Sequence, residues 1–273
     1  MRTINTNTIK STIYNLCLQA NFELDKDILQ KFHANQNNEV INDLIKNAEI
    51  AKTDAVPICQ DTGLVLVFME IGQQVMIEGD DLRTAVNTAV AEAYTKNYLR
   101  KSVLSDPLTR VNTNTNTPAI LYTDIVPGDK IKITVVPKGG GSENKSALKM
   151  LTPADGKEGV IDFVLETVKK AGASACPPFI VGVGLGGTFD YVGFLAKKAL
   201  LRKLGEAHPD QETANLESEL LEKINALNIG PSGFGGNPTA LAIHIETHPC
   251  HIASLPVAVN IGCHANRHAE AII

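Results

Sequence analysis

Apolar residues recur at helical spacing through the first 55 residues of the chain. Two stripes, one early and one late in this stretch, follow the three-to-four-residue period of an amphipathic helix. Their members are Ile9, Ile13 and Leu16, and then Val40, Leu44 and Ala48. The pattern predicts a helical N-terminal part, about 1–55, whose apolar side chains face a core.

From residue 64 onward the pattern changes to short runs of β-forming residues bounded by turn signals. Runs of this length and composition are typical of strands. We predict that 74–77 pairs back across Gly72 onto the preceding run, and that 119–126 and 131–137 are two strands about the tight turn 127–129. The strands predicted here are therefore 64–71, 74–77, 119–126 and 131–137.

The rest of the chain mixes amphipathic stretches with short apolar runs. In 239–248, the alternation of Leu241, Ile243 and Ile245 with other residues predicts a half-buried strand. Helices and strands do not follow the regular order of a βαβ fold. We therefore predict an α+β fold, mixed helices with largely antiparallel sheets, in a single domain over 1–273. The predicted helices are 81–97, 157–171, 188–204 and 212–227, and the further strands are 178–184, 239–248 and 255–261.

Composition and charge argue against several classes of protein. Hydrophobic residues make up 44% of the chain and charged residues 20%, which is too apolar for a disordered protein. Lys and Arg number 25 against 30 Asp and Glu, and the net charge of −5 argues against non-specific binding to a nucleic-acid backbone. No apolar run reaches the ~18–20 residues of a membrane span, and the first residues lack the apolar region of a secretory signal. We expect a cytoplasmic protein.

The chain has five widely spaced cysteines. An odd number without an export signal does not fit a disulfide framework, and no CxxC spacing indicates a zinc or ferredoxin-type site. Cys59, Cys176 and Cys263 each lie where a predicted element ends, and site residues concentrate at such positions. Cys17 and Cys250 fit better as small buried hydrophobic residues.

The segment 59–63, CQDTG, places a thiol, an amide, a carboxylate and a hydroxyl in succession before a glycine. Asp, Thr and Gly are also common turn residues, so a simple turn and a functional site both fit. The residues alone leave these two interpretations open.

Three arginines and one histidine are candidates for binding or proton transfer. A guanidinium group can donate two parallel hydrogen bonds to a carboxylate, which makes Arg100, Arg110 and Arg267 candidate carboxylate binders. His251 is a candidate proton carrier. Single arginines are more often surface charges, and a single histidine is often a hydrogen-bonded structural residue.

Two glycine-rich segments offer alternative chemistry. The segment 138–146, KGGGSENKS, presents backbone N–H groups and two lysines to an anion, without the spacing of a Walker loop. The segment 182–187, GVGLGG, matches GxGxxG after a predicted strand and before a predicted helix. The acidic residue of a dinucleotide site is missing at the end of a following strand, so close backbone packing against the Cys176 segment is the favoured interpretation.

A set of segments, taken in order, resembles the class I, iron–sulfur fumarate hydratases and the related L-tartrate dehydratases. They run from about residue 57 to 267 and cover over three quarters of the chain. These segments are ICQDTG (58–63), YLRKS (98–102), NTNTNTPA (112–119), KGGGSENKS (138–146), MLTPADG (150–156), ACPPFIVGVGLGGT (175–188), NIGPSGFGG (228–236), HIASLPVAV (251–259), and Cys263 with Arg267.

The resemblance implies a [4Fe–4S] cluster held by Cys59, Cys176 and Cys263. Three thiolates leave one iron without a protein ligand, and such an iron can act as a Lewis acid toward a carboxylate and a hydroxyl. By the same resemblance, the substrate-contacting residues are Gln60, Asp61 (also an acid or base), Arg100, Gly141 as a backbone donor, and the active-site histidine His251.

The single-chain members of this family carry a further domain that this sequence lacks. The resemblance therefore implies the α subunit of a two-subunit form, with a separate β subunit that supplies the remaining active-site residues, in an α₂β₂ assembly. The implied reaction is reversible hydration of fumarate to L-malate, with L-tartrate dehydration as the close alternative. The alternatives of other classes are a dinucleotide-binding oxidoreductase using Gly182–Gly187 and a non-catalytic scaffold with a structural cluster.

Overall fold

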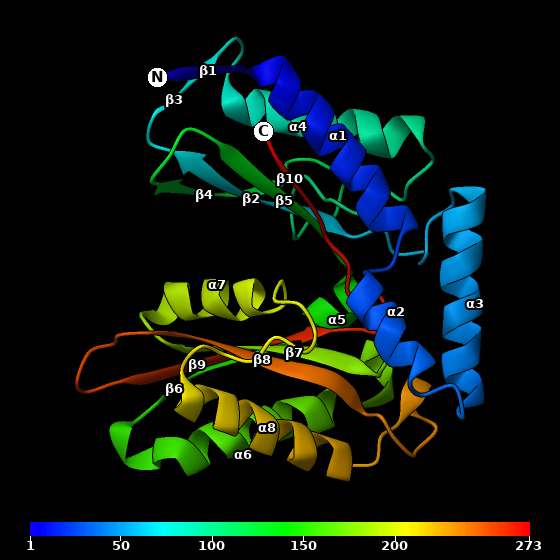
Figure 1. The fold of residues 1–273 in the computed structure, drawn as a ribbon, viewed down its shortest axis with the longest axis vertical. Coiled ribbons are helices and arrows are strands. Elements are labelled where there is room, and N and C mark those ends of the chain that lie inside the picture. The colour runs from blue at the N-terminus through cyan, green and yellow to red at the C-terminus, as the bar shows by residue number, and fades with distance from the viewer. The chain divides into compact units, whose positions relative to one another are not determined.

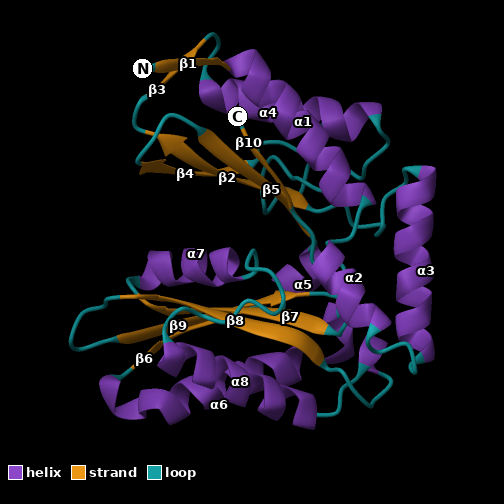
Figure 2. Cartoon of the chain, in the orientation of Figure 1, coloured by secondary structure: helices purple, strands orange, loops and turns teal.

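The computed structural model describes residues 1–273 and combines helices with mixed sheets, which confirms the predicted α+β class (Figure 1 and Figure 2). The chain divides into two compact units. Unit 1 comprises Met1–Asp25, Lys46–Gly140 and Arg267–Ile273, and unit 2 comprises Lys26–Ile45 and Gly141–Asn266. The chain passes from one unit to the other at four points, two of which lie within helices, α3 (Glu39–Asp54) and the short α5 (Gly140–Glu143).

Unit 1 is built on a four-stranded sheet in the order β10-β5-β2-β4. The central strand β2 pairs antiparallel with β5 and parallel with β4, and a separate parallel pair joins β1 to β3. The elements of this unit are β1 (Arg2–Asn5), α1 (Thr6–Phe22), β2 (Leu64–Gly72), β3 (Val75–Glu78), α4 (Leu82–Lys96), β4 (Ile120–Val126), β5 (Ile131–Lys138) and β10 (Ala269–Ile272).

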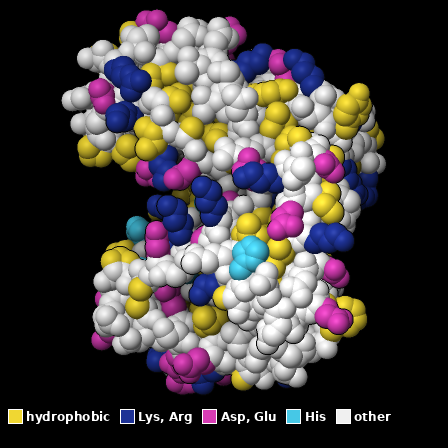
Figure 3. Space-filling view, turned by 45° about the vertical axis from the view of Figure 1, so that its right-hand side comes forward, with side chains coloured by type: hydrophobic (Ala, Val, Ile, Leu, Met, Phe, Trp, Pro, Cys, Tyr) yellow, Lys and Arg dark blue, Asp and Glu magenta, His cyan; other side chains and the backbone are white.

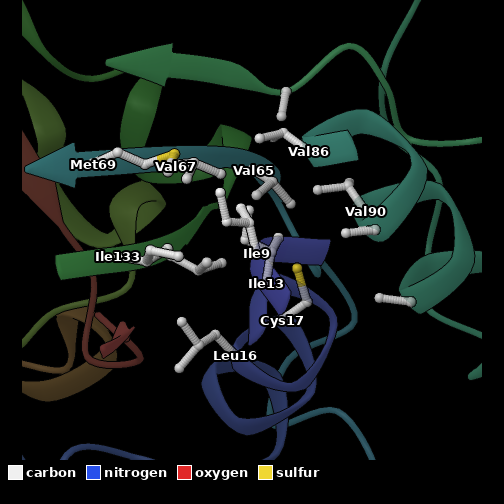
Figure 4. Packing of buried hydrophobic residues seen from close by; sticks show 14 of the residues in the cluster. Ile9, Ile13, Leu16, Cys17, Val65, Val67, Met69, Val86, Val90 and Ile133 are labelled. Carbon is white, nitrogen blue, oxygen red and sulfur yellow. The ribbon is translucent and has the colours of Figure 1, made fainter. Parts of the chain in front are cut away.

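The core of unit 1 lies between this sheet and the two helices α1 and α4 (Figure 4). The predicted stripe of α1 is fully inside it, with Ile9 and Ile13 against Val65 and Val67 of β2. Burying such aliphatic side chains contributes about 1.5–3 kcal/mol each. Cys17 also lies in this core, and burial raises the pKa of its thiol to about 12, which confirms it as a small hydrophobic residue.

Unit 2 is a three-layer arrangement around a second four-stranded sheet, in the order β6-β9-β7-β8 (Figure 1). Helix α7 covers one face, and α6 and α8 cover the other. Its elements are α2 (Lys26–His33), β6 (Ala147–Leu151), the 3₁₀ turn η1 (Pro153–Asp155), α6 (Gly156–Ala171), η2 (Gly172–Ala175), β7 (Phe179–Gly186), α7 (Phe189–Ala199), α8 (Gln211–Ala226), η3 (Pro231–Gly233), β8 (Ala240–His248) and β9 (Leu255–Gly262).

Polar side chains of α8 cover the edge strand of this sheet. The Asn225 amide oxygen accepts the backbone N–H groups of Thr239 and Ala240, at 2.8 and 3.0 Å. The Glu217 carboxylate accepts the N–H of Ile245 at 2.7 Å. An open sheet edge is a template for unwanted strand pairing, and these bonds occupy N–H groups on the edge of β8 that has no neighbouring strand.

Two glycines of the GxGxxG match lie inside β7, on the face that α7 covers. A Cβ at Gly182 would lie 2.2 Å from the carbonyl oxygen of Ala196, and one at Gly184 would lie 2.1 Å from that of Val192. The prediction of close backbone packing is thus confirmed, but the neighbour is α7 and not the Cys176 segment. A dinucleotide site instead needs these glycines at the strand-to-helix turn.

Several predicted elements differ from the structure in pairing or extent. The segment 74–77 forms β3, but it pairs with β1, because both edges of β2 are occupied by β4 and β5. For the same reason β4 and β5 flank β2 and do not pair with each other. The helix predicted at 188–204 ends at Ala199.

Burial and short strands account for the other differences. Strand β8 is buried on both faces along most of its length, because helices cover both sides of the sheet, so it is not half-buried. The N-terminal part of about 1–55 is helical as predicted apart from β1. The strands β1, β6 and β10 are only four or five residues long and carry too little periodicity to predict.

The surface carries charges of both signs. Basic and acidic side chains are interspersed over the face shown in Figure 3, as expected for a net charge of −5. None of the helices combines the length and the apolar character that a bilayer crossing requires.

Candidate active site

In unit 1, the loop between α3 and β2 carries Cys59, Gln60 and Asp61. Ile58, which precedes Cys59, makes two hydrogen bonds that hold the start of the loop. Its N–H donates to the carbonyl of Asn21, and its carbonyl accepts from the Asn47 side chain, both at 2.9 Å. Cys59 is partly exposed, and its sulfur accepts the N–H of Asp61 at 3.4 Å. Hydrogen bonds to the sulfur are a recurrent feature of iron–sulfur ligands.

The Asp61 carboxylate is fixed by two backbone donors. Oδ1 accepts the N–H of Gly63 at 3.0 Å, and Oδ2 accepts the N–H of Gly140 at 2.8 Å. Gly139 leaves room for this contact, because a Cβ there would lie 3.3 Å from Oδ2. The anion that the glycine-rich segment binds here is therefore the chain's own Asp61 carboxylate.

Arg100 is attached to the same loop through its backbone. The Thr62 hydroxyl donates to the carbonyl of Arg100 at 3.0 Å, while the Arg100 residue itself is exposed. Arg267, by contrast, is only 3% exposed, and its guanidinium donates to the carbonyl of Asp61 at 2.7 Å. The structure thus brings Gln60, Asp61 and Arg100 to one region of unit 1, with Arg267 beneath the loop.

In unit 2, Cys176 and Cys263 lie at the same end of the two central strands of the sheet. Cys176 precedes β7 and Cys263 follows β9, and these strands are antiparallel, with Ile180 opposite Gly262. The carbonyl of Cys176 accepts from both the N–H and the ring Nδ1 of His264, at 3.0 and 3.1 Å. Two thiols that are 87 residues apart in sequence are therefore carried by contacting loops.

Local backbone geometry turns the Cys176 residue outward. Cys176 adopts φ 55° and ψ 69°, a left-handed conformation directly after η2, and it is exposed. Gly141 belongs to the same neighbourhood, since a Cβ at that position would lie 3.9 Å from the carbonyl oxygen of Ser174. The exposed Cys176 and the glycine at 141 therefore lie on neighbouring segments that connect strands, where binding residues often occur.

His251 lies elsewhere in unit 2. It precedes β9, whereas Cys263 follows it, and eight residues of strand span roughly 25 Å. The exposed ring accepts the N–H of Ala253 at Nδ1, at 3.1 Å, and lines an open cavity of about 400 Å³ with Lys157 and Cys250. The structure therefore does not bring His251 together with Cys176 and Cys263.

Cys250 differs from its expected burial. It is exposed, because it lies in the loop between β8 and β9, and its thiol donates to the carbonyl of Ser254 at 3.3 Å. Of the two cysteines expected to be buried, only Cys17 is inside a core.

A comparison with protein-family models finds one that spans almost the whole chain, described as Fumarate hydratase (Fumerase) and matched over residues 10–272. The chain belongs to this fumarate hydratase family. Hydratases and dehydratases add or remove water, so this is a hydro-lyase family. The GxGxxG match then has a packing role in β7, and the dinucleotide alternative is not favoured.

Individual relatives carry the name of a related dehydratase. A Methanocaldococcus jannaschii protein, named as a candidate L(+)-tartrate dehydratase subunit alpha, is 45% identical over 96% of both chains. The L(+)-tartrate dehydratase subunit alpha of Escherichia coli O157:H7 is 37% identical over 80% of this chain and 72% of its own length. The same-named protein of Escherichia coli K12 is 36% identical over the same shares.

Three cysteines of this fumarate hydratase family member are of the residue type that binds an iron–sulfur cluster. None of the five cysteines forms a disulfide, and Cys59, Cys176 and Cys263 are at least partly exposed on loops at the ends of elements. Such thiols are the ligands that iron–sulfur clusters use. The structure contains no group of three or more His, Cys, Asp or Glu side chains placed to hold a single metal ion.

Sequence reasoning missed two residues that contact the Cys59–Gly63 loop. Tyr94 donates its hydroxyl to the carbonyl of Thr62, and Asn116 donates to the carbonyl of Gly63 at 3.0 Å. Tyr94 fits the helical pattern of α4, and Asn116 fits a polar loop. Neither pattern marks them as different from their neighbours.

Proposed function

We propose that this chain is the α subunit of a hydro-lyase that adds water reversibly to fumarate, giving L-malate, with a [4Fe–4S] cluster held by Cys59, Cys176 and Cys263. The observation that carries the proposal is the contact between the Cys176 and Cys263 loops at one end of β7 and β9, in a member of the fumarate hydratase family. In this proposal the Cys59 loop supplies the third thiol. All of 1–273 then acts as one catalytic subunit.

When bound, the cluster supplies an iron that lacks a protein ligand and acts as a Lewis acid. The chain's own residues bind and orient the diacid. Arg100 binds one carboxylate through its guanidinium, and the N–H of Gly141 donates a further hydrogen bond. Gln60 contacts the substrate beside Cys59.

Asp61 moves the proton at the substrate hydroxyl. Its carboxylate is oriented by two N–H donors, so it reaches the reacting atoms in one fixed arrangement. General acid or base catalysis by such a group contributes about 10²–10⁴-fold in rate. Asp61→Asn keeps the shape of the side chain and should therefore reduce kcat by about this factor.

His251 is a second proton carrier in this proposal. The eight-residue strand β9, about 25 Å long, separates His251 from Cys263. In this proposal His251 therefore acts at the active site of a second copy of the chain. This is one reason to propose an assembly of two α and two β subunits. The other is that relatives are named as alpha subunits, which suggests a separate β subunit with the remaining active-site residues. We place the assembly in the cytoplasm.

L-Tartrate dehydration is the second candidate reaction. It is favoured by one observation, the dehydratase names of relatives that are 36–45% identical. Fumarate hydration and tartrate dehydration differ by one hydroxyl group on the substrate, and the same residues would serve both. Comparing kcat/KM for L-malate and L-tartrate with the anaerobically prepared αβ assembly decides between them.

The experiment that tests the proposed function is iron and sulfide analysis of single Cys→Ser variants. Cys59→Ser, Cys176→Ser and Cys263→Ser should each lose the cluster and turnover. Cys250→Ser is the matched control, since Cys250 also lies on a loop and forms no disulfide, and it should keep both. Full turnover by an iron-free assembly, or cluster loss in the Cys250 variant alone, would overturn the proposal.

A further inference from the structure

Three consecutive backbone carbonyls of the Cys59–Gly63 loop each accept a hydrogen bond from a different side chain. The Asp61 carbonyl accepts from Arg267 at 2.7 Å, and the Gly63 carbonyl accepts from Asn116 at 3.0 Å. The Thr62 carbonyl between them accepts from the Tyr94 hydroxyl. The donors come from the segment before β10, the loop before β4, and helix α4.

All three donors are buried. Tyr94 and Asn116 are 0% exposed and Arg267 is 3% exposed. Burial raises the pKa of Tyr94 above its ordinary value, so its hydroxyl remains a proton donor. A buried donor that loses its partner is costly, which means that each of these bonds strongly favours one position of the loop.

The loop does not need these bonds to form a turn. The Asp61 side chain already closes the turn onto the N–H of Gly63, so the turn itself does not depend on the three side-chain donors. Three buried donors instead fix the direction of the three successive peptide planes that begin at Asp61, Thr62 and Gly63, directly after Gln60. This arrangement restricts orientation more than a connecting turn requires.

Asn116 also extends the arrangement to Arg100. Its amide oxygen accepts the N–H of Ser102 at 2.7 Å, while its amide nitrogen donates to Gly63. The Thr62 hydroxyl in turn donates to the carbonyl of Arg100. One buried amide therefore joins the loop that carries Asp61 to the segment that carries Arg100.

We propose that Arg267, Tyr94 and Asn116 are positioning residues that hold Gln60, Asp61 and Arg100 in the geometry needed for proton transfer and carboxylate binding. This inference rests on the proposed function. The donors themselves touch no reacting atom and act through the loop. A misplacement of about 1 Å at reacting groups reduces rates by about 10²-fold, so losing one donor should mainly lower kcat.

The test compares Tyr94→Phe with Tyr14→Phe in the loaded αβ assembly. Both variants remove one hydroxyl from unit 1, and the Tyr14 hydroxyl also has one hydrogen-bond partner, the side chain of Asn97 at 3.0 Å. Tyr94→Phe should lower kcat by about tenfold or more, with a smaller change in KM. Tyr14→Phe should leave both unchanged.

A second readout does not depend on turnover. Amide hydrogen exchange of the peptide that covers 59–64, measured on the assembly without substrate, should be about tenfold faster in Tyr94→Phe and unchanged in Tyr14→Phe. Faster exchange together with a wild-type assembly that hydrates no diacid would support the positioning role and refute the proposed function.

A second pair of variants covers the case in which Tyr94→Phe does not fold. Asn116→Ala should show the same fall in kcat and the same faster exchange. Asn114→Ala is its control, because Asn114 lies in the same loop with a similar positive φ (60° against 59°) and is exposed. If Asn116→Ala loses no more kcat than Asn114→Ala, or if exchange over 59–64 is unchanged, the inference is wrong.

Discussion

Replacing Gly184 by alanine tests the close contact between β7 and α7. The added Cβ would lie 2.1 Å from the carbonyl oxygen of Val192 and 2.8 Å from the backbone N of Ala196, whereas ordinary contact begins at 3.4 Å. Both neighbours are helix backbone and cannot rotate away. Either α7 or β7 must therefore move by more than about 1 Å, and β7 is bonded on both sides, to β8 and β9.

The expected cost follows from this overlap. Overpacking a well-packed core usually costs about 1–3 kcal/mol and occasionally more. A backbone clash on the central strand belongs at the upper end, so Gly184→Ala should reduce the free energy of unfolding by about 3 kcal/mol. That is a large share of the roughly 5–15 kcal/mol by which domains are stable.

Gly193→Ala is the matched control. Gly193 lies in α7 itself, and a Cβ there would have Leu148 Cδ1 as its nearest neighbour, at 4.0 Å. With no clash, alanine in a helix interior is favoured over glycine by roughly 0.5–1 kcal/mol. Glycine-to-alanine substitution should therefore lower the free energy of unfolding at Gly184 and raise it at Gly193.

Urea unfolding followed by far-ultraviolet circular dichroism measures both effects. Circular dichroism is the suitable probe because the chain contains no tryptophan. The transition of unit 2 should move to lower urea in Gly184→Ala and to slightly higher urea in Gly193→Ala. A Gly184→Ala variant within about 0.5 kcal/mol of the parent chain would refute the packing described here.

Three further predictions concern unit 2. Burial, and to a smaller extent the charge of Arg202, lower the pKa of His244 from 6.5 to about 4. The contribution of neutral His244 to the free energy of unfolding should therefore be fully present above pH 6.5. Unfolding measurements should show it falling by about 3 kcal/mol as the pH is lowered to about 4. A His244→Asn variant should lose most of that slope, and an equal slope would contradict the assignment. Glu217→Ala should cost about 3 kcal/mol in the same unfolding assay, because it leaves the largely buried Arg202 guanidinium with only the more distant Glu246, at 4.0 Å, and leaves an edge N–H unpaired. If His251 acts at the active site of a second copy, mixing inactive Cys263→Ser and His251→Ala chains should restore activity, because one site of the mixed assembly then has both residues intact. Failure to recover activity would show that both residues must come from the same chain.

Local patterns could predict the elements, but not their partners. The stripe of Ile9 and Ile13 reports a helix because its period is set within one turn of chain. Asp81 could be recognised as the start of α4, and its side chain does accept the N–H of Thr84. The pairing of β3 with β1 depends on which edges remain free after the sheet has formed, and no short segment contains that information.

The candidate site shows the same limit. The loops that carry Cys176 and Cys263 are in contact only because β7 and β9 are antiparallel neighbours. The spacing of the two cysteines in the sequence could not predict this contact, whereas the family resemblance could. GxGxxG was ambiguous because glycine permits close approach of either a phosphate or a helix. The hydrogen bonds of Tyr94 and Asn116 to backbone carbonyls join segments that are far apart in the sequence, so the residue types alone do not predict them.

Mössbauer spectroscopy of the ⁵⁷Fe-loaded αβ assembly, with and without L-malate or L-tartrate, tests the central claim most directly. If three thiols hold four irons and one iron lacks a protein ligand, the substrate should change the spectrum of one quarter of the iron and leave the rest unaltered. A spectrum in which the substrate alters none of the iron, or an assembly that binds no cluster after anaerobic reconstitution, would contradict it.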